Sequence, residues 1–577
     1  MNFLRNFFAS LLAVTVFFLA LFFILLSVAS ADQLVVVEEG AVVHIKMLRP
    51  VTERELENPF EGLPIAPGPA SSIGLVQFRN MLEHARDDDR ISGICLNMDG
   101  FNAGMAHIEE LRNAILDFKS SGKFIYSYAQ YYGEGGYYLA SASDSVFLHP
   151  EGYLEFNGLT AQLFFLKNMF EKIGMEPQIF RVGDFKSAVE PFIREDMSDE
   201  SRLQMTAMME GMNNHMIQGI ATERGINRDT LAAINYRMDV RNPETALEKG
   251  LVDGLLYSDE LMEVLKEQSG NDDLSLVSYS DYTNSYNPSY SSKNKIAVIM
   301  ASGDIVMGEG GNEIIGSDKF VKTIRKARED DGIKAIVLRI NSPGGSYLAS
   351  DAIWREVKLA AEVKPVIASM SNYAASGGYY IAMAADTIVA QPTTITGSIG
   401  IFSILFNVQE LFEDKLGITF DGVNTGRYSD LYSSNRPVST EERAIIQREV
   451  ESNYDTFIRK AAEGRNMDEA ELRSLASGRV WTGLQSMENG LIDVLGGLET
   501  AVDIAAEKAG IADEYNLRYY PPQKTVLEEL LGMDQASMSQ SAIKEELGAA
   551  YPIYREVQKL KRLEGVQART PYSIEIN

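Results

Sequence analysis

Two glycine-rich turns in the second half of the chain carry serines of the kind that enzymes use as nucleophiles. The first turn is NSPGG at 341–345, and the second is AASGGYY at 374–380, which contains Ser376. Each turn follows a short, apolar, β-branched run, as expected at the end of a buried strand. A serine at a strand-to-helix turn exposes its hydroxyl beside backbone N–H groups. Either turn alone is commonly just a tight connection with a capping serine, but the two together predict a nucleophile and an oxyanion hole.

A serine nucleophile needs a base that removes its proton. The chain has five histidines, all of them in the first half, and none lies in a comparable glycine-rich turn. A buried lysine is the alternative base, because desolvation lowers its pKa from about 10.4 toward neutrality. Lys186 lies among small and apolar residues in RVGDFKSAVEPF at 181–192. We therefore expect Lys186 to be the base.

An internal repeat organises the chain and relates this lysine to the serine. FIYSYAQYYGEGGYYLA at 124–140 aligns with VIASMSNYAASGGYYIA at 366–382 at an offset of 242 residues. Two further matches keep the same order, 91–100 with 333–342 and 246–254 with 486–494. Three ordered matches at nearly constant spacing identify a tandem duplication.

The two halves have lost complementary groups. Glu134 is the repeat partner of Ser376, whereas the position that corresponds to Lys186 holds Arg427 or Tyr428, depending on a one-residue gap. Arginine does not release its proton at working pH, so it cannot act as the base. The first half has the lysine without the serine, and the second has the serine without the lysine. This pattern predicts one active site built from both halves, either within one chain or across a subunit boundary.

Each half alternates short apolar strands with amphipathic helices, which is typical of parallel sheets covered by helices. We expect α/β halves at residues 40–270 and 294–512. The segment 271–293 is rich in Ser, Asn, Asp and Tyr, which indicates a linker or a loose strand. Residues 513–577 are expected to form a C-terminal tail with one charged helical stretch near 542–563.

The N-terminus contains a candidate membrane anchor. Residues 7–29 carry no charge, and a helix of that length crosses a hydrocarbon core of about 30 Å. Arg5 precedes the apolar run and Asp32 follows it, which places the body of the protein on the non-cytoplasmic side. Residues 1–31 would then be a cytoplasmic stub and a transmembrane helix. The last three of these residues, ASA, also resemble a signal-peptidase site, so the anchor is either retained or removed after residue 31.

The composition excludes several functions. The 81 acidic residues outnumber the 53 basic residues and give a net charge of −28. A surface this acidic repels phosphate backbones, so we expect no nucleic-acid partner. The single cysteine, Cys95, excludes an intrachain disulfide and cysteine-rich metal sites. The sequence contains neither HEXXH nor GxxxxGK[ST], so we expect no metal, no ATP and no other cofactor.

The motifs NSPGG, AASGGYY, RVGDFKSAVEPF and TGSIGIF (396–402) resemble those of peptidase family S49, the signal peptide peptidases, in its long, duplicated form. These serine proteases are related in fold to the Clp protease subunit and the crotonases. The resemblance covers about 40–520 and implies a tandem ClpP/crotonase-like α/β fold. It implies a Ser/Lys dyad of Ser376 and Lys186, in which Ser398 orients the lysine amine. It also implies an oxyanion hole made by backbone N–H groups of Gly344, Gly345 and Gly377.

The same resemblance implies a homotetramer at the inner (cytoplasmic) membrane, with its catalytic body on the periplasmic side. Such an enzyme would degrade cleaved signal peptides and other apolar peptides without a cofactor. Extended substrates are expected to add as strands beside the glycine-rich turns.

Two other functions remain compatible with the sequence. A crotonase-like acyl-CoA enzyme would use the same oxyanion hole, and it would hydrolyse a thioester rather than a peptide. A non-catalytic, membrane-tethered scaffold would fail to react with a fluorophosphonate at Ser376.

Overall fold

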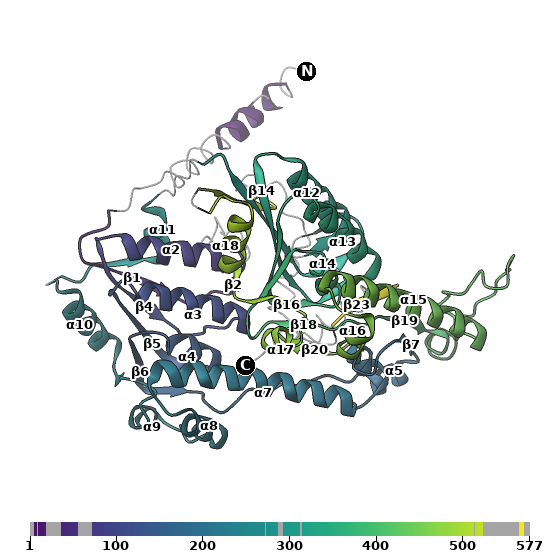
Figure 1. Cartoon of the computed structure of the whole chain (residues 1–577), viewed down its shortest axis with the longest axis horizontal. Helices are drawn as coiled ribbons and strands as arrows, with labels where there is room; N and C mark the ends of the chain where they lie inside the picture. The colour runs from purple at the N-terminus through teal and green to yellow at the C-terminus, as the bar shows by residue number, and fades with distance from the viewer. Residues whose placement is uncertain are drawn as a thin grey trace.

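The computed structural model describes residues 5–8, 10–18, 36–55, 72–271, 273–286, 292–311, 314–512, 514–522 and 565–570. Figure 1 shows two α/β halves side by side, the first in purple to blue and the second in teal to yellow-green. The long helix α7 of the first half runs beneath both.

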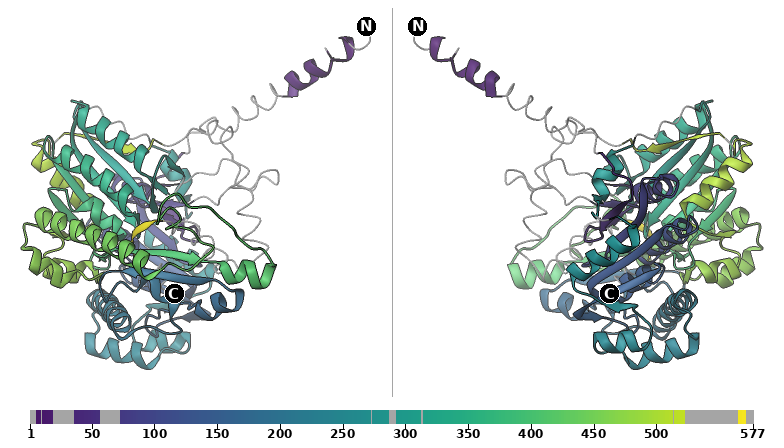
Figure 2. Two further views of the ribbon diagram at one scale, coloured as in Figure 1. Left: turned by 90° about the vertical axis from the view of Figure 1, so that its right-hand side faces the viewer. Right: turned by 90° about the vertical axis from the view of Figure 1, so that its left-hand side faces the viewer.

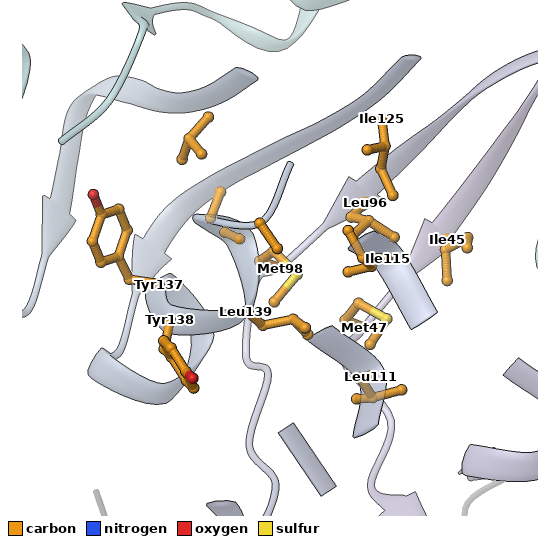
Figure 3. Packing of buried hydrophobic residues seen from close by; sticks show 14 of the residues in the cluster. Ile45, Met47, Leu96, Met98, Leu111, Ile115, Ile125, Tyr137, Tyr138 and Leu139 are labelled. Carbon is orange, nitrogen blue, oxygen red and sulfur yellow. The ribbon is translucent and has the colours of Figure 1, made fainter. Parts of the chain in front are cut away.

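The first half contains a six-stranded parallel sheet in the order β8-β6-β5-β4-β1-β9. Its strands are β1 (Ala41–Lys46), β4 (Ile91–Asn97), β5 (Phe124–Tyr132), β6 (Ser145–Leu154), β8 (Gly254–Leu255) and β9 (Leu276–Ser278). Figure 3 shows the core between this sheet and helix α3, where Ile115 lies beside Leu96 and Leu111 lies near Met47. The central strands are buried on both faces, which explains their nearly continuous apolar sequence.

The second half repeats this arrangement. Its sheet has the order β22-β10-β14-β16, continued by β17 and β21 on one branch and by β18 and β20 on another. The strands are β10 (Lys295–Ser302), β14 (Ile333–Ser342), β16 (Val366–Ala375), β17 (Thr387–Ala390), β18 (Ile395–Gly397), β20 (Val480–Thr482), β21 (Val494–Leu495) and β22 (Asn516–Tyr520). The path β22-β10-β14-β16-β17-β21 matches β9-β1-β4-β5-β6-β8 strand for strand. The predicted α/β duplication is therefore confirmed.

The helices are duplicated as well. The larger pairs are α2 (Leu75–Asp87) with α12 (Ser317–Glu329), α3 (Met105–Lys119) with α13 (Tyr347–Ala361), α4 (Glu134–Ala140) with α14 (Gly377–Ala382), and α7 (Asp199–Arg224) with α15 (Thr440–Arg465). Both α7 and α15 have 26 residues, and each is preceded by an N-cap serine, Ser198 or Ser439, whose side chain accepts a hydrogen bond from a backbone N–H of the first turn. The remaining helices are α5 (Lys167–Ile173), α6 (Glu190–Ile193), α8 (Arg228–Arg237), α9 (Pro243–Glu248), α10 (Ser258–Ser269), α11 (Tyr279–Asn284), α16 (Glu469–Leu475), α17 (Gly483–Glu488) and α18 (Leu498–Lys508).

A third, mixed sheet joins the two halves, in the order β12-β13-β11-β15-β23-β19-β7. Its strands are β12 (Gly310–Gly311), β13 (Ile314–Gly316), β11 (Asp304–Val306), β15 (Gly344–Ser346), β23 (Val566–Arg569), β19 (Phe402–Asn407) and β7 (Glu176–Arg181). Strand β7 belongs to the first half, and all its residues pair antiparallel with β19 of the second half. A short ladder of β2 (Val51–Thr52) and β3 (Ile73–Gly74) stands apart.

A buried ionic network also connects the halves. The side chain of Arg339 on β14 is fully buried, with its guanidinium 2.8 Å from the Glu53 carboxylate and 2.5 Å from that of Glu110. Both carboxylates come from the first half, and His107 lies 3.0 Å from Glu53. Removing one member of such a buried set leaves an uncompensated charge, so the network fixes how the halves sit together.

Both halves extend further than the predicted boundaries. The segment 271–293, which we interpreted as a linker or loose strand, contains β9 and α11, and β9 pairs with β1. Strand β22 begins four residues after the predicted end of the second half and pairs in the same way with β10. Strand β9 has only three residues, LVS, and β22 carries Asn516 and Arg518, so neither shows the long apolar run of a central strand, and the sequence did not fix their bounds. The helical stretch predicted near 542–563 lies outside the described residues.

In the part of the chain that the structure describes, no helix has the length and apolarity needed to cross a bilayer. Residues 9 and 19–29 of the predicted span at 7–29 lie outside the described residues.

Candidate active site

Ser376 occupies the sharp turn between strand β16 and helix α14. Its backbone has φ 55° and ψ −110°, a conformation that costs free energy in a residue with a side chain. Two hydrogen bonds hold it there: its N–H donates to the Gly397 carbonyl at 2.8 Å, and its carbonyl accepts from the Tyr380 N–H at 2.8 Å. This is the strained strand–turn–helix geometry that presents a nucleophilic hydroxyl in many hydrolases.

Lys186 reaches this turn because backbone hydrogen bonds join the segment before it to the second half. Strand β7 pairs with β19 so that Arg181 lies opposite Phe402. Beyond the strand, the Val182 N–H donates to the Ile401 carbonyl and the Phe185 N–H to the Ser477 carbonyl, both at 3.1 Å. The next residue is Lys186, so these backbone contacts direct a lysine of the first half into the core of the second.

The structure brings the three predicted side chains together. The Nζ atom of Lys186 lies 2.9 Å from Oγ of Ser376. It also lies 3.1 Å from Oγ and 3.1 Å from the carbonyl oxygen of Ser398. All three residues are fully buried. The two contacts with Ser398 hold the lysine amine beside the hydroxyl of Ser376.

The electrostatics favour a neutral amine at this position. Complete burial lowers the pKa of Lys186 well below its ordinary value, and burial is the only cause acting on it. Among the described residues, the hydrogen-bond partners of Nζ are hydroxyl and carbonyl oxygens, with no carboxylate to hold an ammonium ion. A neutral lysine amine beside a serine hydroxyl is able to accept its proton.

The three predicted oxyanion glycines lie at the same end of the sheet. Gly344 has φ +105°, and a Cβ at this position would lie only 2.8 Å from the backbone nitrogen of Gly377. The Gly344 N–H donates to Oγ of Ser342 at 3.2 Å, which leaves the N–H groups of Gly345 and Gly377 as the better candidates for binding an oxyanion.

Two residues that support Lys186 escaped the sequence reasoning. The side-chain amide of Gln204 on α7 donates to Oγ of Ser187 at 2.7 Å and to the Phe185 carbonyl at 3.1 Å, and its oxygen accepts from the Val480 N–H at 3.1 Å. Gln204 thus connects the lysine loop, residues 182–187, to strand β20 of the second half by hydrogen bonds. Nothing in the local pattern around this glutamine indicates such a role.

The second missed residue is Gly478, which packs directly on the lysine backbone. It has φ +79°, and a Cβ at this position would lie 2.6 Å from Cβ of Lys186. Its conformation and this close approach both require glycine. The signal in the sequence is a serine–glycine pair at 477–478 that ends a helix, which on its own reads as an ordinary turn.

The equivalent turn in the first half holds no nucleophile. Glu134 begins α4 as Ser376 precedes α14, and it is buried with its pKa raised to about 7 by desolvation. One carboxylate oxygen accepts hydrogen bonds from the Asn235 side chain at 2.5 Å and from the Gly158 N–H at 3.0 Å. The counterparts of Lys186, Arg427 and Tyr428, are exposed on the surface of the second half. Of the two equivalent turns, both among the described residues, the one in the second half therefore holds a serine with a lysine amine beside it, and that lysine comes from the first half.

A serine on a strand-to-helix turn of a parallel α/β sheet, with a buried amine beside it, defines the class of α/β serine hydrolases. The model of the Clp protease family matches residues 290–394. The model of peptidase family S49 matches residues 117–272 and 358–512, one segment in each half. The chain belongs to peptidase family S49 and is a serine protease with a duplicated, ClpP-like α/β fold.

Curated relatives agree with this assignment. The chain is 33% identical to Protease 4 of Haemophilus influenzae over 502 residues, covering 84% of this chain and 81% of that protein. It is 38% identical to the chloroplastic serine protease SPPA of Arabidopsis thaliana over 453 residues, 76% of this chain and 66% of that protein, slightly under two thirds. A putative signal peptide peptidase SppA of Enterococcus faecium is 35% identical over 235 residues, 39% of this chain and 67% of its own length.

Proposed function

We propose that this protein is a membrane-anchored endopeptidase that degrades cleaved signal peptides with a Ser/Lys dyad. Ser376 is the nucleophile and Lys186 the general base. The observation that carries the proposal is the 2.9 Å contact between the lysine Nζ and the serine Oγ inside a fully buried site.

The reaction follows from this geometry. The neutral amine of Lys186 takes the proton of Ser376 as Oγ attacks the carbonyl carbon of the substrate. The ammonium then gives that proton to the nitrogen of the departing peptide, which leaves an acyl-enzyme. Water, deprotonated by the same amine, hydrolyses the acyl-enzyme and restores the serine.

Ser398 and the glycines complete the site. Ser398 orients the amine through its hydroxyl and carbonyl, each 3.1 Å from Nζ. The negative charge that develops on the substrate oxygen is stabilised by the backbone N–H groups of Gly345 and Gly377, because the Gly344 N–H already donates to Oγ of Ser342. Such donors typically contribute about 3 kcal/mol each.

The signal-peptide substrate is supported by the name of the Enterococcus faecium relative and by the apolar N-terminal run. An anchor at residues 7–29 would hold the enzyme where apolar fragments are released into the bilayer. The charges around this run favour a cytoplasmic stub in 1–31, with the body on the periplasmic side of the inner membrane. The halves at 40–270 and 294–512, extended by their edge strands, form the body, and we propose that it assembles as a homotetramer.

The test compares peptide hydrolysis by the detergent-solubilised full chain with three variants. Ser376→Ala and Lys186→Ala should each lose more than 99% of the rate, because a nucleophile and its base act as a unit. Ser486→Ala is the matched control: it removes a fully buried hydroxyl from α17 of the same half and should keep most of the activity. A fluorophosphonate should label the wild-type chain at Ser376.

Other results would point elsewhere. Hydrolysis of an acyl-CoA thioester without peptide cleavage would support the crotonase-like alternative, and absence of labelling would support the scaffold. A reporter fused after Asn577 that is active only in the cytoplasm would contradict the proposed topology. A monomeric mass in native mass spectrometry would contradict the tetramer.

A further inference from the structure

The chain places its own C-terminal segment in the active-site region. Strand β23 (Val566–Arg569) lies between β15 and β19 and pairs antiparallel with both. Figure 2 (left) shows it in yellow at the centre of the molecule, beside the green helices of the second half. Strand β15 contains Gly344 and Gly345, so β23 occupies the edge beside the glycine-rich turn to which an extended substrate would add.

The register places the carbonyl of Ala568 at the oxyanion glycines. Ala568 lies opposite Gly345 and is fully buried. A Cβ on Gly344 would lie 2.1 Å from the Ala568 oxygen, and a Cβ on Gly377 would lie 3.0 Å from it. The Thr570 N–H donates to the Pro343 carbonyl at 2.8 Å. Because paired residues alternate in an antiparallel ladder, the next hydrogen-bonded pair is Gly345 with Ala568.

The residues on either side of Ala568, Gln567 and Arg569, also have defined surroundings. The guanidinium of Arg569 lies 2.9 Å from the carboxylate of Asp304 on β11, and each side chain is only 12% exposed. Gln567 is buried on the other side of Ala568, opposite Phe402 of β19. An ion pair this shielded from water is selective for a cation at the position after Ala568.

We propose that residues 566–570 occupy the place of a substrate between β15 and β19, which we call the peptide groove. The side chains of this segment then indicate which substrate residues the groove prefers. The groove takes a small side chain at the residue whose carbonyl meets the glycines, and a basic side chain at the next residue, selected by Asp304. The segment competes with substrate for β15 and β19, and it must leave before a substrate binds. This inference rests on the proposed peptidase site.

Binding, rather than turnover, provides the test. The protein is the full chain with Ser376→Ala, which cannot cut peptides, and the probe is a fluorescent peptide of residues 563–572, LEGVQARTPY. Deleting residues 566–577 should tighten probe binding at least tenfold, because the competing strand is gone. Deleting only 571–577 keeps the strand and should leave the affinity unchanged. In the full chain, Ala568→Phe should act like the longer deletion, since a fully buried site has no room for the ring.

The probe sequence tests the selectivity. With the longer deletion, a probe carrying Phe at the position of Ala568, or Glu at that of Arg569, should bind at least tenfold more weakly. Asp304→Lys should reverse the preference between the Arg and Glu probes. Equal affinity of full and truncated chains, or indifference to these changes, would overturn the inference.

These outcomes are separable from those of the proposed function. If wild-type hydrolysis proves independent of Ser376 while the binding contrasts hold, the peptidase proposal fails and the groove occupant stands. If hydrolysis depends on Ser376 and the contrasts are absent, only the groove inference fails.

Discussion

The Nζ atom of Lys186 lies 2.9 Å from Oγ of Ser376, although 190 residues separate them in the sequence. The contact forms within one chain, because strand β7 of the first half is paired along its length with β19 of the second. The two halves thus contribute to one site, in which the second half supplies the serine and the first half the lysine amine.

The peptidase rate should rise with pH and reach a plateau as Lys186 loses its proton. Burial lowers the pKa of this amine well below its ordinary value, so the midpoint of kcat/KM should lie well below about 10.4. A pH–rate profile from pH 5 to 10 measures it. A midpoint near 10.4 would mean that the lysine works as a solvated amine, contrary to the structure.

Lys186→Met should abolish hydrolysis and yet stabilise the fold. Because burial lowers the pKa of Lys186, there is a pH window between the folded and unfolded pKa values in which the unfolded chain binds a proton that the folded chain lacks, and stability rises with pH across that window. A methionine avoids the cost of keeping this amine neutral, and the gain at pH 7 should be about 1–3 kcal/mol, shrinking toward pH 10. Thermal unfolding at both pH values measures it. Lys172→Met, at an exposed lysine on α5, is the control and should change little.

The contact between Ser376 and Lys186 was predictable from the sequence, because both residues differ from their partners in the repeat. Ser376 has Glu134 as its partner, and Lys186 has an arginine or a tyrosine, so each catalytic candidate is visible as a difference between two otherwise similar halves. The alternating strands and helices were also predictable, because strands buried on both faces of a parallel sheet appear in the sequence as apolar runs.

The supporting residues were not predictable, because their roles arise only from packing between distant segments. Gln204 lies on a long amphipathic helix, and Gly478 lies in an ordinary-looking turn. Strand β23 has just four residues, with a polar and a charged residue among them. Backbone pairing with β15 and β19 holds this strand in position. Because such pairing does not depend on the side chains, it produces no apolar pattern in the sequence.

Ser398→Ala should lower kcat about 10- to 100-fold and leave KM nearly unchanged. The variant removes the hydroxyl 3.1 Å from Nζ but keeps the carbonyl contact of the same residue. Because the hydroxyl acts through the lysine, the pH midpoint should shift as well. Steady-state kinetics across the pH range would reveal both changes. A loss confined to KM would instead place Ser398 in substrate binding.

Gln204→Met should lower kcat about tenfold by loosening the lysine loop. The substitution preserves volume while it removes the hydrogen bonds to Ser187, Phe185 and Val480. A positioning role predicts an altered pH midpoint with unchanged KM, whereas a purely structural role predicts lower stability with normal kinetics of the folded fraction. Gln218→Met, at an exposed position of the same helix, is the matched control.

Glu134→Gln should stabilise the protein at pH 8 and have little effect at pH 4. Burial raises the pKa of this carboxyl from 4.5 to about 7, so between these values the folded chain holds a proton that the unfolded chain releases. Stability therefore falls as pH rises through this window, by at most about 3 kcal/mol. Glutamine is always neutral and still accepts the hydrogen bonds from Asn235 and Gly158.

Denaturant unfolding of both proteins from pH 4 to 8 measures the difference in stability between Glu134→Gln and the wild type, which should grow with pH and level off above about 7. Parallel curves at every pH would show that the carboxyl is already ionised in the folded chain.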